Sequence, residues 1–360
     1  HHRKSDHAYR KLHQNFYSPR DVKRQAMLAF AAVFFQFSTA LLSAENPTAP
    51  LLGEGNATVS PVEKSLATLR ISLVKRDKQY SRSVQSLILL NELKGGVELH
   101  PGRQPKIGLK VSTHFAPGLT TPPRLVDAVL EFLKVRGFRL DDVFLLDLEA
   151  NNLRRAGFLP PLSVGTNSYR GHRVLALDSR RHFDTKWFHD SPIPPTADYR
   201  ARIILRNPRD RATRLREERR SYLPAPLFID DAYWINLPVA LDSRSLVIDA
   251  AVANASLRAV DNNARFLGRQ TTAPAAATEI LAVPEYWEKH LFSILDLSRF
   301  QYAGGDRFDA SFIASEPTLL LSENPFSLDA FALVALNKAR EVKGFKPRPR
   351  KGSPLFRFAE

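Results

Sequence analysis

Lys110, His114, Thr120 and Thr121 lie close together in the chain and carry side chains that proteins use to hold anions. Lys110 offers a positive charge, and free backbone N–H groups at a helix start after Thr121 would attract a phosphate or a carboxylate. The two prolines that follow Thr121 remove two of these donors, and Thr121 is equally explained as a helix cap. We expect a small anionic ligand here and name these four residues as candidate contacts.

Aspartates at predicted strand ends and helix starts could supply oxygen ligands to a divalent cation. They are Asp147, Asp178, Asp296 and Asp329. Ordinary capping explains any one of them. A metal site therefore needs three of them to converge, and Asp147, Asp296 and Asp329 are its candidate ligands.

Asn236 and Asn254 are amides within otherwise apolar segments. A buried amide needs hydrogen-bond partners, and these can be backbone groups or a ligand. Both interpretations are open, so both residues are kept as candidate ligand contacts.

The elements that would position these residues begin with a strand, a helix and a second strand within 106–148. Apolar residues alternate in the first strand, the helix is expected to start at a Thr121 cap and end at Gly137, and the second strand covers 143–148. Such a unit makes two parallel strands. It places the loop 112–121 at the carboxyl end of a strand, where α/β folds usually bind ligands.

Further strands and helices alternate along the chain, whereas 182–199 is predicted to be an irregular excursion. The expected strands are 174–177, 233–237, 292–297 and 319–321, and the expected helices are 60–74, 209–220, 245–259, 284–292 and one after a cap at Ser327. This alternation predicts a single large α/β domain, with a mainly parallel β-sheet and helices on both faces.

The amino-acid composition excludes several kinds of site and indicates the charge of the partners. The 360 residues include no cysteine, which excludes disulfides, thiolate nucleophiles and cysteine-ligated iron–sulfur clusters. The formal net charge is +15, from 52 Lys and Arg against 37 Asp and Glu, which favours anionic partners. Nine arginines fall within 200–220, and 343–357 is a second basic run. A solvated basic surface is favoured over a nucleic-acid site, since no known nucleic-acid motif accompanies them.

The amino-terminal region has a pattern typical of a secretory signal peptide. The segment 27–44 contains an apolar stretch of signal-peptide length, 28–42, with Lys23 and Arg24 just ahead of it and the small residues Ser43 and Ala44 behind it. This predicts export to a periplasmic or extracellular location, with a buried amphipathic helix as the alternative. Residues 1–44 would then form an extension, 45–59 a linker, 60–345 the α/β domain and 346–360 a basic tail.

Three ordered blocks resemble the domain of unknown function 362 family. They are Lys110 with Thr120-Thr121-Pro122, Asp231–Pro238 (DAYWINLP) with Asn254 in the following helix, and Leu321–Ala330 (LSENPFSLDA). The resemblance covers about residues 60–340 and implies an uncharacterised α/β domain. Many relatives carry ferredoxin-like cysteine clusters beside this domain, so a chain without cysteine does not inherit an electron-transfer role.

The chain departs from the family pattern at three places. Ser112 stands where the family has asparagine, Ala240-Leu241-Asp242 replaces a Lys-Thr-His-like triplet, and Ala253 replaces the lysine before Asn254. Two basic positions that could hold an anion are therefore gone.

Three functions stay open: a protein that binds a small anion, with or without metal-assisted catalysis; a non-catalytic relative; or a basic protein that attaches to nucleic acid or an anionic membrane.

Overall fold

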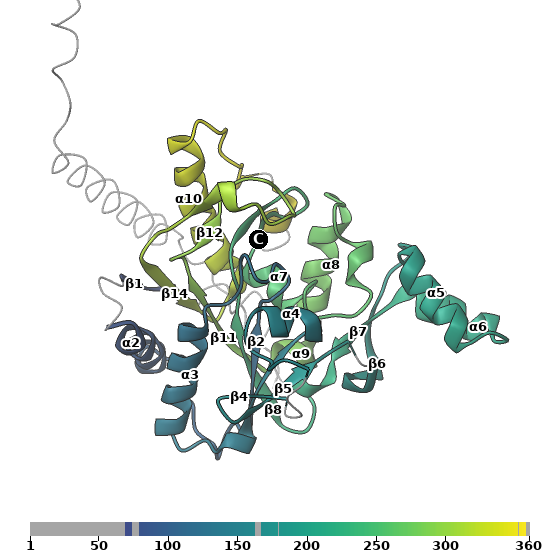
Figure 1. Cartoon of the computed structure of the whole chain (residues 1–360), viewed down its shortest axis with the longest axis horizontal. Coiled ribbons are helices and arrows are strands. Elements are labelled where there is room, and N and C mark those ends of the chain that lie inside the picture. The colour runs from purple at the N-terminus through teal and green to yellow at the C-terminus, as the bar shows by residue number, and fades with distance from the viewer. Residues whose placement is uncertain (1–68, 74–78, 163–166, 179, 352, 358–360) are drawn as a thin grey trace, which may run out of the picture. The chain divides into compact units, whose positions relative to one another are not determined.

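The computed structural model describes residues 69–73, 79–162, 167–178, 180–351 and 353–357. In this part of the chain the main sheet has eight strands (Figure 1). Their order across the sheet is β1 (Arg70–Leu73), β14 (Thr318–Ser322), β11 (His290–Asp296), β8 (Ala232–Leu237), β2 (Lys106–Val111), β3 (Val143–Asp147), β5 (His172–Ala176) and β4 (Ser168–Tyr169). The five strands from β11 to β5 are parallel, and the outer strands pair antiparallel. The predicted α/β class is confirmed.

Helices cover both faces of the sheet because its strands are apolar on both faces. On β2, Ile107 and Leu109 pack into the core beneath α2 (Tyr80–Leu93) and α3 (Pro123–Val135). On the opposite face, Trp234 and Leu295 pack into a second core. It is covered by α7 (Ala251–Ala255), α8 (Thr272–Leu281), α9 (Pro284–Trp287) and α10 (Pro325–Val342). Strands buried on both sides are the rule for parallel sheets.

The order of the parallel strands reverses between β2 and β8. After β2 the chain adds β3 and β5 on one side, and it then returns to add β8 and β11 on the other side. The connections that leave the carboxyl ends of β2 and β8 therefore diverge, and such a switch point is where open α/β sheets bind ligands.

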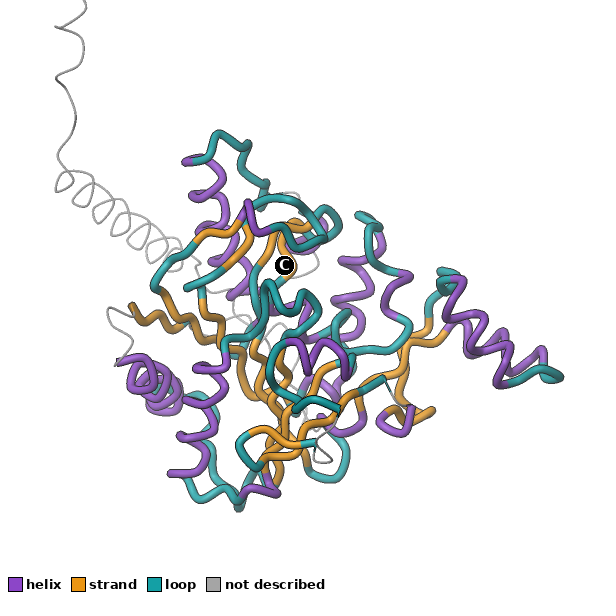
Figure 2. Tube along the Cα trace, in the orientation of Figure 1, coloured by secondary structure: helices purple, strands orange, loops and turns teal. Residues whose placement is uncertain are grey.

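Two smaller sheets flank the main one. The first contains β10 (Val247–Asp249), β9 (Leu241–Ser243), β12 (Phe300–Gln301) and β13 (Ile313–Ala314). The second pairs β6 (Phe183–Asp190) with β7 (Arg220–Pro224). Between β6 and β7, the helices α5 (Ala197–Arg206) and α6 (Arg211–Arg219) extend away from the main sheet (Figure 2).

Several predicted elements were wrong. The segment 182–199 contains β6 and the start of α5 instead of an irregular excursion. The helix expected over 245–259 is β10 followed by the short α7, because small apolar residues fit either buried element. The helix expected over 284–292 ends at Trp287, and β11 begins at His290. The described end of the helix expected over 60–74 is the edge strand β1.

Two features at the carboxyl side also differ from expectation. The last helix is capped by Asn324, whose Oδ1 accepts from the Phe326 N–H at 2.9 Å, and not by Ser327. The region called a basic tail folds back on the domain. Leu355 and Phe356 are buried in its core, and Arg348 pairs with the buried Asp242 at 2.7 Å.

The predicted signal segment 27–44 and the linker 45–59 lie outside the described residues. Among the described helices, none combines the length and the apolarity that a membrane span requires.

Candidate functional site

Lys110 lies at the switch point with its side chain wholly buried. Its ammonium donates to Asp147 Oδ1 at 2.7 Å, to Asn254 Oδ1 at 3.1 Å and to the Val111 carbonyl at 3.0 Å. Burial lowers the pKa of Lys110, and the charge of Asp147 opposes this shift. An ammonium has three N–H donors. All three are used inside the protein, so Lys110 joins β2, β3 and α7 instead of pointing at a ligand.

The two predicted asparagines extend this buried network. Asn254 Nδ2 donates to Asn236 Oδ1 at 2.7 Å, and Asn236 Nδ2 donates to the Ala251 carbonyl at 2.9 Å and to Ser293 Oγ at 3.0 Å. Polar atoms thus run continuously from β3 to β11 beneath α7. Of the two amides, Asn254 also lines the cavity described below.

Asp147 organises the start of the loop after β2. Its Oδ2 accepts from both the backbone N–H and the hydroxyl of Thr113, at 2.7 and 2.6 Å. Its Oδ1 accepts from the Leu148 N–H at 2.8 Å in addition to Lys110. The carboxylate is therefore fully engaged, and it fixes the direction in which the loop 112–121 leaves the sheet.

Thr121 closes the base of the same loop, and the prediction that it caps α3 was wrong. The N-cap is Pro122. The Thr121 hydroxyl accepts from the Ser112 N–H at 2.7 Å and donates to the Leu237 carbonyl at 2.5 Å. It ties together the carboxyl ends of β2 and β8. Thr120 is half-buried and is not among the residues that line either cavity described below.

The structure does not bring the candidate metal ligands together. Asp296 accepts from Tyr80 and Arg124, at 2.7 and 3.3 Å. Asp329 accepts from the first two N–H groups of α7, at 2.6 and 3.1 Å, and Asp178 accepts from the Ala150 N–H. Burial raises the pKa of Asp329, while its two backbone hydrogen bonds lower it. Within the described residues, no three His, Asp or Glu side chains gather as a metal site would require. Capping and ion pairing account for these carboxylates.

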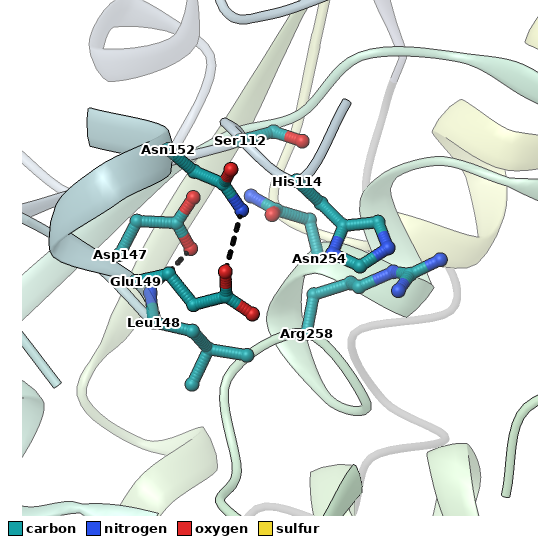
Figure 3. Close-up of a pocket in the computed structure, with 8 residues that line it drawn as sticks. All are labelled: Ser112, His114, Asp147, Leu148, Glu149, Asn152, Asn254 and Arg258. Carbon is teal, nitrogen blue, oxygen red and sulfur yellow. Dashed lines mark hydrogen bonds between the residues drawn. The ribbon is translucent and has the colours of Figure 1, made fainter. Parts of the chain in front are cut away.

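A small polar cavity opens at the carboxyl ends of β2 and β3, and Figure 3 shows the side chains around it. The lining residues are Ser112, His114, Asp147, Leu148, Glu149, Asn152, Asn254 and Arg258. Its volume of about 10 Å³ is that needed by a single water molecule. The exposed Glu149 accepts from Asn152 Nδ2 at 3.0 Å on one side of the cavity. The Arg258 guanidinium lies on the other side, beside the His114 ring.

Among the described residues that line this cavity, Arg258 is the one with a buried side-chain atom that lacks a hydrogen-bond partner. It is only 5% exposed. Its Nε and Nη2 donate to Asp249 Oδ2 at 3.2 and 2.7 Å. Its Nη1 is buried and has no hydrogen-bond partner among the described residues. A buried donor without a partner costs about 1–3 kcal/mol, so a ligand oxygen at this atom would be favoured.

A wider groove of about 430 Å³ adjoins the cavity and shares His114 with it. Its walls are the loop 114–118, the segment 306–308 and Arg155 from the end of α4 (Ala150–Arg155). Gly118 allows the two walls to meet, because a Cβ at this position would lie 2.2 Å from the Phe308 ring. The groove thus combines aromatic surface with exposed arginines, and its volume is ordinary for a small-molecule site.

His114 stands between the two spaces. Its pKa is lowered to about 4, first by desolvation and then by the charge of Arg258. The ring is therefore neutral at pH 7. Of the four contacts predicted around the loop 112–121, His114 is the one that the structure places on both cavities.

Sequence reasoning missed Arg258, Glu149 and Asn152. Glu149 and Asn152 follow directly after β3, so their place at the carboxyl edge was available from the predicted strand. Arg258 carries no such local signal. It follows α7 in a turn, and its partner Asp249 precedes α7.

Comparisons with known proteins add little to this site. The chain matches no family model and no curated protein. It is similar to the crystal structure of a protein from Thermotoga maritima, a structural genomics target, with 11% identity and a TM-score of 0.33. That similarity covers 75% of this chain and 59% of the other, so the match spans less than two thirds of that protein.

Proposed function

We propose that this protein binds a small oxyanion, a phosphate or carboxylate group, at the switch point between β2 and β8. The proposal rests on Arg258, which lines a polar cavity and whose buried Nη1 has no hydrogen-bond partner among the described residues. The buried charges around this atom are paired, Lys110 with Asp147 and Arg258 with Asp249. The proposal therefore concerns binding and assigns no reaction.

The sizes of the two spaces suggest how such a ligand would lie. The inner cavity accommodates about one oxygen-sized atom, whereas the groove can hold the body of a small molecule. A ligand would place one anionic oxygen near Arg258 and rest its body between Phe115 and Phe308. Arg258 also stacks over the Phe115 ring, 5.3 Å from its centroid, which links the two spaces.

The proposal includes a distant relationship to the domain of unknown function 362 family. Its support is that the three resembling blocks meet around α7. Asn254 receives a hydrogen bond from Lys110 and gives one to Asn236, and Asp329 accepts from the first N–H groups of the helix. Export remains part of the proposal only through the sequence of 27–44.

Replacing Glu149 by glutamine is expected to strengthen sulfate binding about tenfold. The substitution removes a negative charge from the cavity but keeps an oxygen that can accept from Asn152. A unit charge and the doubly charged sulfate about 6 Å apart in water interact by about 1.4 kcal/mol, which is about tenfold in affinity. Isothermal titration with sulfate measures the change. The matched control is Glu341→Gln, an exposed residue at the end of α10.

Equal sulfate affinities for the wild type and both variants would show that the anion lies elsewhere. Absence of any saturable sulfate binding by the folded wild type would remove the oxyanion proposal itself.

Sulfate binding is also expected to strengthen as the pH falls from 7 toward 4. His114 is neutral in the free protein because its pKa is lowered to about 4. A bound anion beside the ring raises that pKa, so the complex takes up a proton and affinity increases with acidity. Sulfate is the suitable probe because its own charge is constant over this range. In the double variant His114→Gln/Glu149→Gln the pH dependence of the dissociation constant should be flat, and a dependence undiminished from that of Glu149→Gln alone would assign it to another group.

A further inference from the structure

The helices α5 and α6 form an arm that carries most of the chain's densest arginine cluster (Figures 1 and 2). Ion pairs join the two helices, between Arg200 and Glu218 at 3.3 Å and between Arg206 and Glu217 at 3.7 Å. At the root of the arm, the Tyr199 hydroxyl donates to Asp261 at 2.6 Å. These contacts hold the arm together and attach it to the domain.

Other arginines of the arm point to solvent. Arg202, Arg209 and Arg211 are exposed, and within the described residues they form no hydrogen bond or ion pair. In contrast to Arg200 and Arg206, they play no part in joining the two helices. Their charges are therefore available to an anionic surface.

Large apolar side chains lie among these free charges. Leu205 is 80% exposed and Leu215 is 53% exposed. Leu205 follows Arg202 by three positions in α5, and Leu215 follows Arg211 by four positions in α6. Residues at these spacings share one face of a helix. Each helix thus presents arginine and leucine side by side to solvent.

We infer that this arm docks on an anionic membrane surface. Guanidinium groups pair with lipid phosphates, and leucines beside them can enter the boundary between headgroups and acyl chains. A nucleic-acid backbone would pair with the arginines but would give the two leucines no apolar environment. A second copy of the arm is disfavoured, because the two arms would carry the same charge.

The test is flotation of the full chain with two kinds of vesicle, one of phosphatidylcholine alone and one of equal parts phosphatidylcholine and phosphatidylglycerol. The wild type should bind the anionic vesicles more tightly. Reversing the three free charges in R202E/R209E/R211E should weaken this binding about 100-fold, at about fivefold for each arginine. The variant L205S/L215S should weaken it about tenfold without changing charge.

The matched control is K94E/K134E/K343E, which reverses three exposed charges outside the arm. It should float like the wild type. The apolar segment 28–42 is present in every variant, so a difference between variants belongs to the arm. Circular dichroism checks that each variant is folded.

Equal flotation of the arm variant and the control variant would overturn the inference. A second result would also overturn it: L205S/L215S floats like the wild type, and R202E/R209E/R211E alone loses binding to duplex DNA. That combination would assign the arm to nucleic acid.

Discussion

Replacing Lys110 by methionine is expected to lower the free energy of unfolding by about 3–5 kcal/mol. The substitution leaves the carboxylate of Asp147 buried without its ammonium partner, and an uncompensated buried charge carries a penalty of about this size. It also removes the hydrogen bond that orients Asn254. Urea denaturation followed by circular dichroism measures the loss.

The control is Lys106→Met on the same strand, where the side chain is exposed and the expected change is within about 0.5 kcal/mol. A second substitution, Asp147→Asn, should restore part of the stability in the Lys110→Met background. The asparagine oxygen can still accept the two hydrogen bonds from Thr113, although the Leu148 N–H, which donates to the other carboxylate oxygen, loses its acceptor. If Lys110→Met unfolds at the same urea concentration as Lys106→Met, the ion pair does not have the structural role assigned to it.

This prediction replaces the simpler expectation that Lys110 contacts the ligand. Direct contact would make Lys110→Met lose sulfate binding while the protein stays fully stable. The buried position of Lys110 predicts the opposite result. Lys110→Met should lower the free energy of unfolding, and it should change sulfate binding only through the displacement of Asn254.

The sequence was sufficient for the elements around the switch point. Each element of this β–α–β unit has a local signal in the sequence. Apolar residues alternate in β2, a proline starts the helix and Gly137 follows its end, and β3 is apolar throughout. These signals together predict the parallel pair of β2 and β3. The position of Lys110 on this unit also followed. Its partners did not, because Asp147 lies 37 positions away and Asn254 lies 144 positions away.

Thr121 shows why a correct local pattern can give the wrong role. A hydroxyl before proline is typical of a helix cap. Here the neighbouring strand β8 offers the Leu237 carbonyl as a partner, and the hydroxyl links two strands instead. That β8 lies beside β2 depends on the order of strands in the sheet, which no local segment specifies.

The loss of a predicted helix over 245–259 had a larger consequence for the site. Small apolar residues fit a buried helix or a buried strand equally well. The chain uses them for β10, the five-residue α7 and a turn, and this arrangement brings Asp249 and Arg258 together across nine positions. Arg258 was therefore missed as a candidate anion contact because the secondary structure predicted for 245–259 was wrong.

Substitutions at the ion pair of Arg258 and Asp249 are expected to have the second large effect on stability. They also distinguish a loss of sulfate binding from a loss of folding. Arg258→Met should lower the free energy of unfolding by about 3–5 kcal/mol, because the Asp249 carboxylate is then buried alone. It should also remove sulfate binding. The double variant Arg258→Met/Asp249→Asn has no unpaired charge, so it should recover most of the stability while sulfate binding stays absent. Urea denaturation and isothermal titration measure the two quantities.

The charge-matched control is Arg269→Met, an exposed position outside the site, which should bind sulfate like the wild type. Comparison with this control removes the general effect of losing one positive charge. A stable double variant that still binds sulfate with wild-type affinity would eliminate Arg258 as the anion contact and the proposed function with it. A stable double variant without sulfate binding would instead assign the Arg258 guanidinium to the ligand, because the loss of the Asp249 charge would by itself favour an anion.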